Sequence, residues 1–170
     1  NRETPDKGKI GMSQYEPKKI EELQMVLLKD PRSPVFASLA EAYRQMGLIE
    51  EALEVTTRGV KHNPEYVSGL VAHAKVLFEL KDFRQAAKFL VKATALKPEN
   101  ILALKILGHC FLKMRNHPAA LKTFKKLLIL KPNDENIIKM VKKWEFLDNI
   151  PTESGPETFS VDGYDHWVHK

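Results

Sequence analysis

The sequence predicts an all-α fold built from a repeated helical hairpin. Pro64, Pro98 and Pro132 stand 34 residues apart, and counting back from each proline aligns units of equal length. Within each unit, apolar residues recur at steps of three and four, which places them on one face of a helix. A single long coiled coil is excluded, because proline breaks the interior of a helix. The aligned units are residues 33–66, 67–100 and 101–134.

Turn-forming residues divide each unit into two helices. Gly47 follows the first helical stretch of the first unit, and Lys81 and Arg115 stand at the same position of the next two. Asp82 and Asn116 are candidate N-caps of the second helices, because short polar side chains accept hydrogen bonds from exposed backbone N–H groups. The predicted helices are residues 34–46, 49–62, 68–80, 83–96, 102–114 and 118–130.

The aligned units resemble the tetratricopeptide repeat over residues 33–134. Small residues recur at the eighth and twentieth positions, and the segment SPVFASLAEAYRQMGLIEEALEV is similar to the bacterial form of the motif. The resemblance implies a right-handed superhelical stack of about eight helices. His73 departs from the pattern, since a large apolar residue is usual there, and Thr56 and Gly59 are smaller than usual.

Segments on either side of the repeats are predicted to cover the ends of the stack, because one repeat cannot bury its apolar face alone. Residues 17–30 are a predicted N-terminal capping helix, and residues 135–147 a C-terminal capping helix. Lys142 occupies the eighth position of the latter, where close contact with another helix would be unfavourable. The remaining segments are a polar N-terminal stretch, 1–16, and an acidic, aromatic tail, 148–170.

No motif for catalysis or for a cofactor is found in the sequence, so we expect a protein that is not an enzyme and holds neither metal nor cofactor. The histidines lack zinc-ligand spacing, and the only cysteine, Cys110, cannot form an internal disulfide. No apolar run is long enough to span a membrane, and no signal peptide is visible. These features favour a cytoplasmic location in a reducing compartment.

The resemblance also implies a peptide-binding groove lined by the first helix of each unit. Apolar side chains such as Phe78 and Leu112 would anchor a partner, unless they are buried against the second helix. Ala37 and Glu41 replace the basic and asparagine residues with which one chaperone-binding subgroup grips a C-terminal carboxylate, so that specificity is not expected. The predicted groove residues are Ser38, Glu41, Arg44, Gln45, Val71, Lys75, Phe78, Glu79, Leu102, Lys105, His109, Leu112, Lys113, Lys139 and Lys143, and Phe146 extends the same surface.

Charge changes along the chain in a way that bears on the partner. The first unit has three basic and five acidic residues, the second six and three, and the third seven and one. Such a basic end would attract an acidic partner, although a solvated basic face has the same composition. Nucleic acid is an unlikely partner, because aromatic residues are not interleaved with the basic ones. The leading prediction is therefore an adaptor that binds a peptide or helix of another protein.

The tail suggests a second function. It carries five acidic residues and one lysine, together with Phe159, Val161, Tyr164 and Trp167. Opposite charge and aromatic anchors would let it dock on the third unit or on the groove, in its own molecule or in a neighbour. Docking on a neighbour would give a homo-oligomer, whereas docking in its own molecule would compete with a ligand. Incidental packing on the convex side is the alternative without a function.

Overall fold

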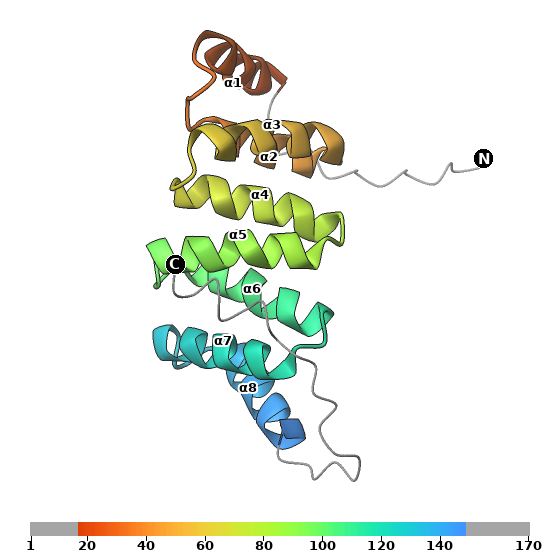
Figure 1. Cartoon of the computed structure of the whole chain (residues 1–170), viewed down its shortest axis with the longest axis vertical. Coiled ribbons are helices and arrows are strands. Elements are labelled where there is room, and N and C mark those ends of the chain that lie inside the picture. The colour runs from red at the N-terminus through yellow and green to blue at the C-terminus, as the bar shows by residue number, and fades with distance from the viewer. Residues whose placement is uncertain (1–16, 149–170) are drawn as a thin grey trace, which may run out of the picture. The chain divides into compact units, whose positions relative to one another are not determined.

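The computed structural model describes residues 17–148, which form eight α-helices and no strand (Figure 1). The predicted all-α class is thereby confirmed. The largest difference from the predicted bounds is at the start of the first repeat, where Pro34 and Val35 form a turn before the helix begins. The helices are α1 (Pro17–Lys29), α2 (Phe36–Gln45), α3 (Ile49–His62), α4 (Val67–Glu79), α5 (Phe83–Leu96), α6 (Ile101–Lys113), α7 (His117–Leu130) and α8 (Glu135–Asp148).

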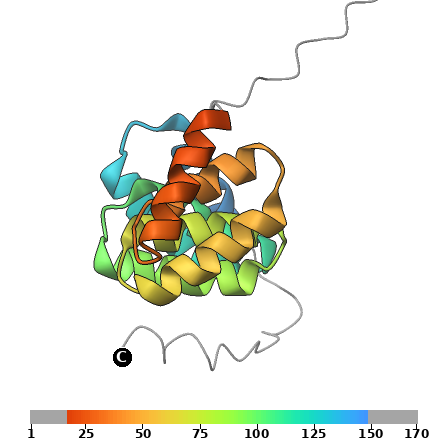
Figure 2. The same cartoon turned by 90° about the horizontal axis from the view of Figure 1, so that it is seen from above.

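The chain divides into an N-terminal unit that ends at Val76 and a C-terminal unit that begins at Leu77. In the N-terminal unit, α2 packs against α3, and α1 lies over this hairpin (Figure 2). In the C-terminal unit, consecutive helices from α5 to α8 pack against one another (Figure 1). Within each unit, neighbours in the sequence are thus neighbours in space, as expected for a helical repeat.

The core of the N-terminal unit is built around one phenylalanine. The ring of Phe36 is buried, and a side chain added at either Gly59 or Gly69 would overlap it. Tyr66 covers the ring edge-on, with the ring centroids 5.9 Å apart. The small residue at Gly59, which departs from the repeat pattern, is therefore required by the size of its neighbour.

His73 and Thr56, which also depart from the repeat pattern, form a buried polar pair. His73 is only 5% exposed, and its Nδ1 lies 2.8 Å from Oγ1 of the fully buried Thr56. The same hydroxyl donates to the backbone oxygen of Ala52 at 2.8 Å. A polar side chain can replace the usual apolar residue here because the facing helix supplies a hydrogen-bonding partner.

The turns inside the three hairpins share one backbone geometry. Gly47, Lys81 and Arg115 all have positive φ, at 76°, 63° and 58°. After each of them, a backbone N–H reaches back five residues to a carbonyl oxygen of the preceding helix, as from Leu48 to Tyr43 at 2.9 Å. This is the bond of a Schellman motif, which closes a helix through a left-handed residue. Asp82 and Asn116 then cap the following helices through their side chains, as predicted.

Candidate functional site

The predicted groove residues of the N-terminal unit are mostly accessible. Ser38 and Gln45 are exposed, whereas Glu41, Arg44 and Lys75 are half-buried and contact one another. Val71 is the exception, because it is 5% exposed and belongs to the core. A buried side chain offers no area to a partner, so the prediction that Val71 lines a groove is wrong.

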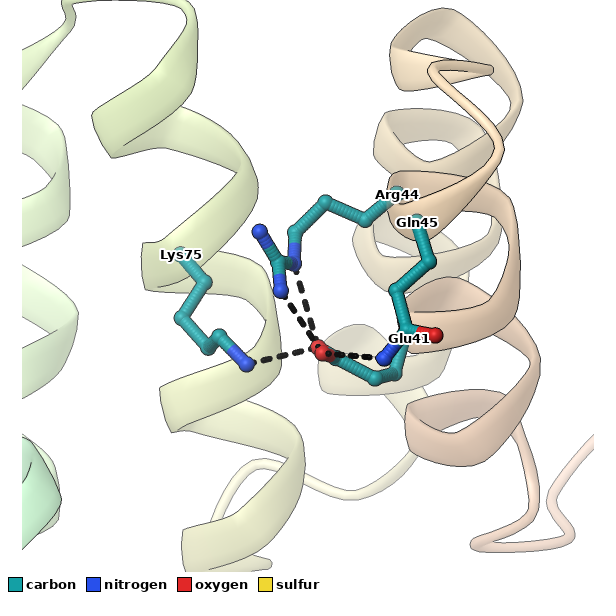
Figure 3. Close-up of polar contacts among 4 residues, drawn as sticks. All are labelled: Glu41, Arg44, Gln45 and Lys75. Carbon is teal, nitrogen blue, oxygen red and sulfur yellow. Dashed lines mark hydrogen bonds and ion pairs between the residues drawn. The ribbon is translucent and has the colours of Figure 1, made fainter. Parts of the chain in front are cut away.

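Glu41 is the centre of a network of charged groups on α2 and α4 (Figure 3). Arg44 donates from Nη2 to one carboxylate oxygen at 2.7 Å and from Nε to the other at 3.1 Å. Lys75 donates to the second oxygen at 2.6 Å, and Gln45 to the first at 3.3 Å. Arg44 and Gln45 lie one turn along α2 from Glu41, and Lys75 comes from α4. The residue at the ninth position of one repeat thereby pairs with its equivalent in the next.

These contacts keep Glu41 ionised. The hydrogen bonds from Arg44 and Lys75, and the positive charge of both, lower its pKa from 4.5 to about 2, although partial burial opposes the shift. The side chains of Glu41, Arg44 and Lys75 remain 23%, 23% and 24% exposed. The network therefore lies at the surface, partly shielded from water, where ion pairs are stronger than fully exposed ones.

The C-terminal unit places a basic face with apolar residues on α6. Lys105 and Lys113 are exposed, as is Leu102 at 48%, whereas His109 and Leu112 are half-buried. His109 packs edge-on against Phe124, with the ring centroids 5.6 Å apart. Burial lowers the pKa of His109, and the charges of Lys105 and Lys113 lower it further, so the imidazole is neutral at pH 7. Within residues 17–148, neither lysine has an ion-pair partner.

The end of α4 carries the remaining predicted anchor. Phe78 is half-buried and packs edge-on against Phe83, the first residue of α5, with the centroids 5.1 Å apart. Neither Phe78 nor Leu112 is wholly buried against a second helix, so both keep some area for a partner. Glu79, next to Phe78, is exposed.

On α8, the predicted groove residues are exposed lysines. Lys139 lies 3.6 Å from Glu135, a pair so open to solvent that it contributes little to stability. The Nζ of Lys143 lies 5.5 Å from the ring centre of Trp144, which also contacts the ring of His117. Phe146 is 70% exposed.

Two hollows were not predicted from the sequence. In the N-terminal unit, α1, α2 and α3 enclose about 350 Å³, lined by Leu27, Leu39 and Val55 among others. In the C-terminal unit, a groove between α7 and α8 is lined by apolar residues such as Leu128, Ile129 and Ile138 and by the charged residues Lys125, Lys142 and Glu145. Apolar residues outside the core stripe, such as Ile129 at 79% exposure, are the sequence signal that could have indicated the second.

The described residues contain no arrangement typical of metal or thiol chemistry. Among residues 17–148, no three histidine, cysteine or acidic side chains are close enough together to hold a metal ion. Cys110 is fully buried, and burial raises the pKa of its thiol to about 12, so the reactive thiolate is not formed near neutral pH. None of the eight described helices is long and apolar enough to cross a membrane. The predicted docking residues of the tail, Phe159, Val161, Tyr164 and Trp167, lie outside the described residues.

Comparison with known proteins agrees with the repeat pattern. A family profile described as tetratricopeptide repeat matches residues 77–143. From α4 to α8, this chain thus carries the tetratricopeptide repeat pattern. No curated protein sequence matches it closely enough to be counted as similar.

Solved structures of tetratricopeptide repeat proteins share the fold. MamA is 21% identical, with a TM-score of 0.70 over 76% of this chain and 77% of MamA. TTC0263, a thermophilic protein of Thermus thermophilus, is 22% identical, with a TM-score of 0.62 over 76% of this chain and 73% of its own. The first tetratricopeptide domain of Spaghetti (RPAP3), solved with the HSP90 peptide SRMEEVD, is 22% identical, with a TM-score of 0.61 over 69% of this chain and 95% of that domain. At these identities the similarity concerns the fold.

Proposed function

We propose that this chain is a non-enzymatic interaction module that binds an acidic, partly apolar peptide or helix of a partner protein. The observation that carries the proposal is the face of α6, where Lys105 and Lys113 are exposed beside Leu102 and the half-buried Leu112. Two cations without an ion-pair partner within residues 17–148 attract carboxylates, and the leucines offer apolar area between them. A basic face that serves only to keep the surface hydrated would account for the exposed lysines, but not for the exposed Leu102 beside them.

Two similar structures support a peptide ligand of this chemistry. The first domain of Spaghetti (RPAP3) and the second domain of human RPAP3 were solved with the peptides SRMEEVD and SGPTIEEVD, which both end in Glu-Glu-Val-Asp. This chain has Ala37 and Glu41 at positions where the chaperone-binding subgroup has basic and asparagine residues. We therefore propose a different acidic ligand, held mainly through α6.

Charge reversal on α6 tests the proposal. The full chain would be titrated with two fluorescent amphipathic peptides, one of leucine and glutamate and one of leucine and lysine, and binding followed by anisotropy. We expect the acidic peptide to bind at least about 10-fold more tightly than the basic one, since each close charge pair contributes roughly 1 kcal/mol. The double variant Lys105→Glu and Lys113→Glu should lose about 10-fold in affinity for the acidic peptide.

The matched control is the double variant Lys122→Glu and Lys126→Glu. It makes the same change of charge at two exposed lysines of α7, a second helix of the repeat. We expect its affinity to stay within about 2-fold of the parent. Equal losses in the two double variants would show general charge attraction and contradict a site on α6, as would an acidic peptide that does not bind at all.

A second candidate function is self-assembly through the C-terminal tail. The groove between α7 and α8 favours it, because Ile129 is 79% exposed and Lys142 also lines the groove, as does Lys125, which is paired with Glu145 at 2.8 Å. Residues 148–170 begin at the end of α8 and carry acidic and aromatic side chains that match such a groove. Occupation by the tail of the same chain would leave a monomer, whereas exchange between chains would link subunits.

Cross-linking distinguishes these outcomes. A photoreactive residue at position 129 of the full chain should form adducts with residues 149–170, detected by mass spectrometry. A mixture of ¹⁵N-labelled and unlabelled chains shows whether the adduct joins one chain or two. The control places the same group at Leu96, which is 44% exposed on α5. No adduct in the tail, or equal adducts from position 96, would contradict docking in this groove.

A further inference from the structure

The carboxylate of Glu41 is held in the manner in which proteins hold the carboxylate of a ligand. Arg44 binds both of its oxygens, Lys75 adds the shortest contact at 2.6 Å, and Gln45 adds an amide donor at 3.3 Å (Figure 3). A guanidinium that contacts two oxygens of one carboxylate, completed by an ammonium group, is a typical recognition arrangement for this anion. Donors from two helices thus converge on a single acidic group.

The setting differs from that of an ordinary surface ion pair in the same unit. Arg58 and Glu54 also lie 2.8 Å apart, but both are 68% exposed and both belong to α3. Glu41, Arg44 and Lys75 are less than a quarter exposed, and their positions are those that the repeat pattern assigns to the ligand-facing side. Partial shielding from water strengthens the attraction of these cations for an anion. The remaining exposure lets an anion from solution reach them.

We propose that Arg44, Gln45 and Lys75 form a carboxylate-binding site that the chain fills with its own Glu41. The consequence for selectivity rests on the proposed function. A tethered carboxylate has an effective concentration of millimolar or more, so a carboxylate of a partner at ordinary concentration does not displace it. Acidic groups of a partner are therefore not accepted at this site, and only neutral or cationic groups are accepted over Glu41.

Removal of Glu41 should open the site to an external anion. We would titrate the ¹⁵N-labelled full chain with glutarate, a small dicarboxylate, and with glutaramide, its neutral analogue, and record amide chemical shifts. In Glu41→Ala and Glu41→Gln, glutarate should give saturable shifts at residues 41–45 and 72–76, with a Kd on the order of millimolar. In the parent chain, binding at these residues should be at least about 10-fold weaker, and glutaramide should not bind to any form.

Two controls separate this site from general effects of charge. Glu54→Ala removes an acid from an exposed pair, releases Arg58 alone, and should create no glutarate site on α3. Adding Lys75→Met to Glu41→Ala should abolish the new site while a thermal scan shows that the chain still folds. The glutarate titration involves neither Lys105 nor Lys113, so its outcome is independent of the acidic-peptide experiment.

The proposal is overturned by either of two results. One is the absence of glutarate shifts in both Glu41→Ala and Glu41→Gln, provided that both variants keep the helical spectrum of the parent. The other is a parent chain that binds glutarate at residues 41–45 as tightly as the variants do. In that case Glu41 would stabilise the contact between α2 and α4 without occupying a binding site.

Discussion

The two units differ in whether the cationic side chains on the first helix of each repeat are paired with an acid. In the N-terminal unit, the cations Arg44 and Lys75 are already paired with Glu41. In the C-terminal unit, Lys105 and Lys113 have no ion-pair partner within residues 17–148, and the ninth position of the third repeat is His109, not an acid. First helices of the repeat thus carry cations paired with an acid in the N-terminal unit, and exposed cations without such a partner among the described residues in the C-terminal unit.

The units also differ in how a large ring is accommodated beside glycine. Phe36 lies against both Gly59 and Gly69, whereas Phe124 meets Gly108 with the tip of its ring. A Cβ added at Gly108 would lie 2.6 Å from Cζ of Phe124. At Gly59 it would overlap the base of the Phe36 ring, and the tip of the same ring already lies against Gly69. The N-terminal core is therefore the less tolerant of added volume.

The largest expected effect follows from this contrast in packing. Gly59→Ala should lower the free energy of unfolding by about 2–3 kcal/mol, since the overlap outweighs the gain of up to about 1 kcal/mol in helix propensity. Gly108→Ala should lower it by about 1 kcal/mol or less, because only the tip of a ring must shift. Chemical denaturation of both variants measures the difference. Equal losses would show that the two cores are equally rigid.

A double variant sharpens the result. Phe36→Leu alone should be destabilising, because it removes volume from a filled core. Combined with Gly59→Ala, it should cost less than the sum of the two single changes, because the smaller side chain relieves the overlap. Additive losses would mean that Gly59→Ala acts through something other than Phe36.

The next effect is a loss of stability in mild acid, carried mainly by the N-terminal unit. Burial lowers the pKa of His73 from 6.5 to about 4. The unfolded chain therefore takes up the proton first, and the stability present above pH 6.5 is lost progressively as the pH falls toward 4. Between pH 7 and pH 5 the loss from this group should reach up to about 2 kcal/mol, measured by denaturation at each pH.

Variants assign this loss to a unit. His73→Gln should remove most of the change in the free energy of unfolding between pH 7 and pH 5. The pKa of His109 is lowered in the same direction, but His109→Gln should remove less of this change. Glu41 acts in a lower window, because its pKa falls from 4.5 to about 2 and its stabilisation is lost only below pH 4.5. An unchanged pH profile in His73→Gln would contradict the assignment.

The smallest expected effect concerns the hairpin turns. Lys81 and Arg115 adopt positive φ, which costs a residue with a Cβ about 1 kcal/mol, whereas Gly47 adopts it without strain. Lys81→Gly and Arg115→Gly should each raise the free energy of unfolding by up to about 1 kcal/mol, less the greater entropy of the unfolded chain. Gly47→Ala should lower it by about 1 kcal/mol. Thermal unfolding of the three variants tests the signs, and a destabilised Lys81→Gly would contradict the backbone argument.

Much of the fold follows from the sequence, because it depends on local and periodic information. The spacing of Pro64, Pro98 and Pro132 sets the length of the repeat, and the three-and-four steps of apolar residues set the helices. The sequence also predicts Asp82 and Asn116 as caps, because capping needs only the residue and its near neighbours. The charge of the third repeat is likewise a property of composition.

The pairings between residues far apart in the chain depend on the tertiary structure and could not be predicted from the sequence. Lys75 of α4 pairs with Glu41 of α2, and His73 of α4 lies within hydrogen-bonding distance of Thr56 of α3. The spacing of apolar residues does not specify how each helix is rotated about its axis relative to its neighbours. The same packing buries Val71, which the repeat pattern predicts at the surface, and brings two glycines against the ring of Phe36. A helical period of 3.6 residues identifies the apolar face of each helix. It does not show which side chains at the edge of that face form hydrogen bonds or ion pairs with another helix. That depends on the packing of neighbouring helices.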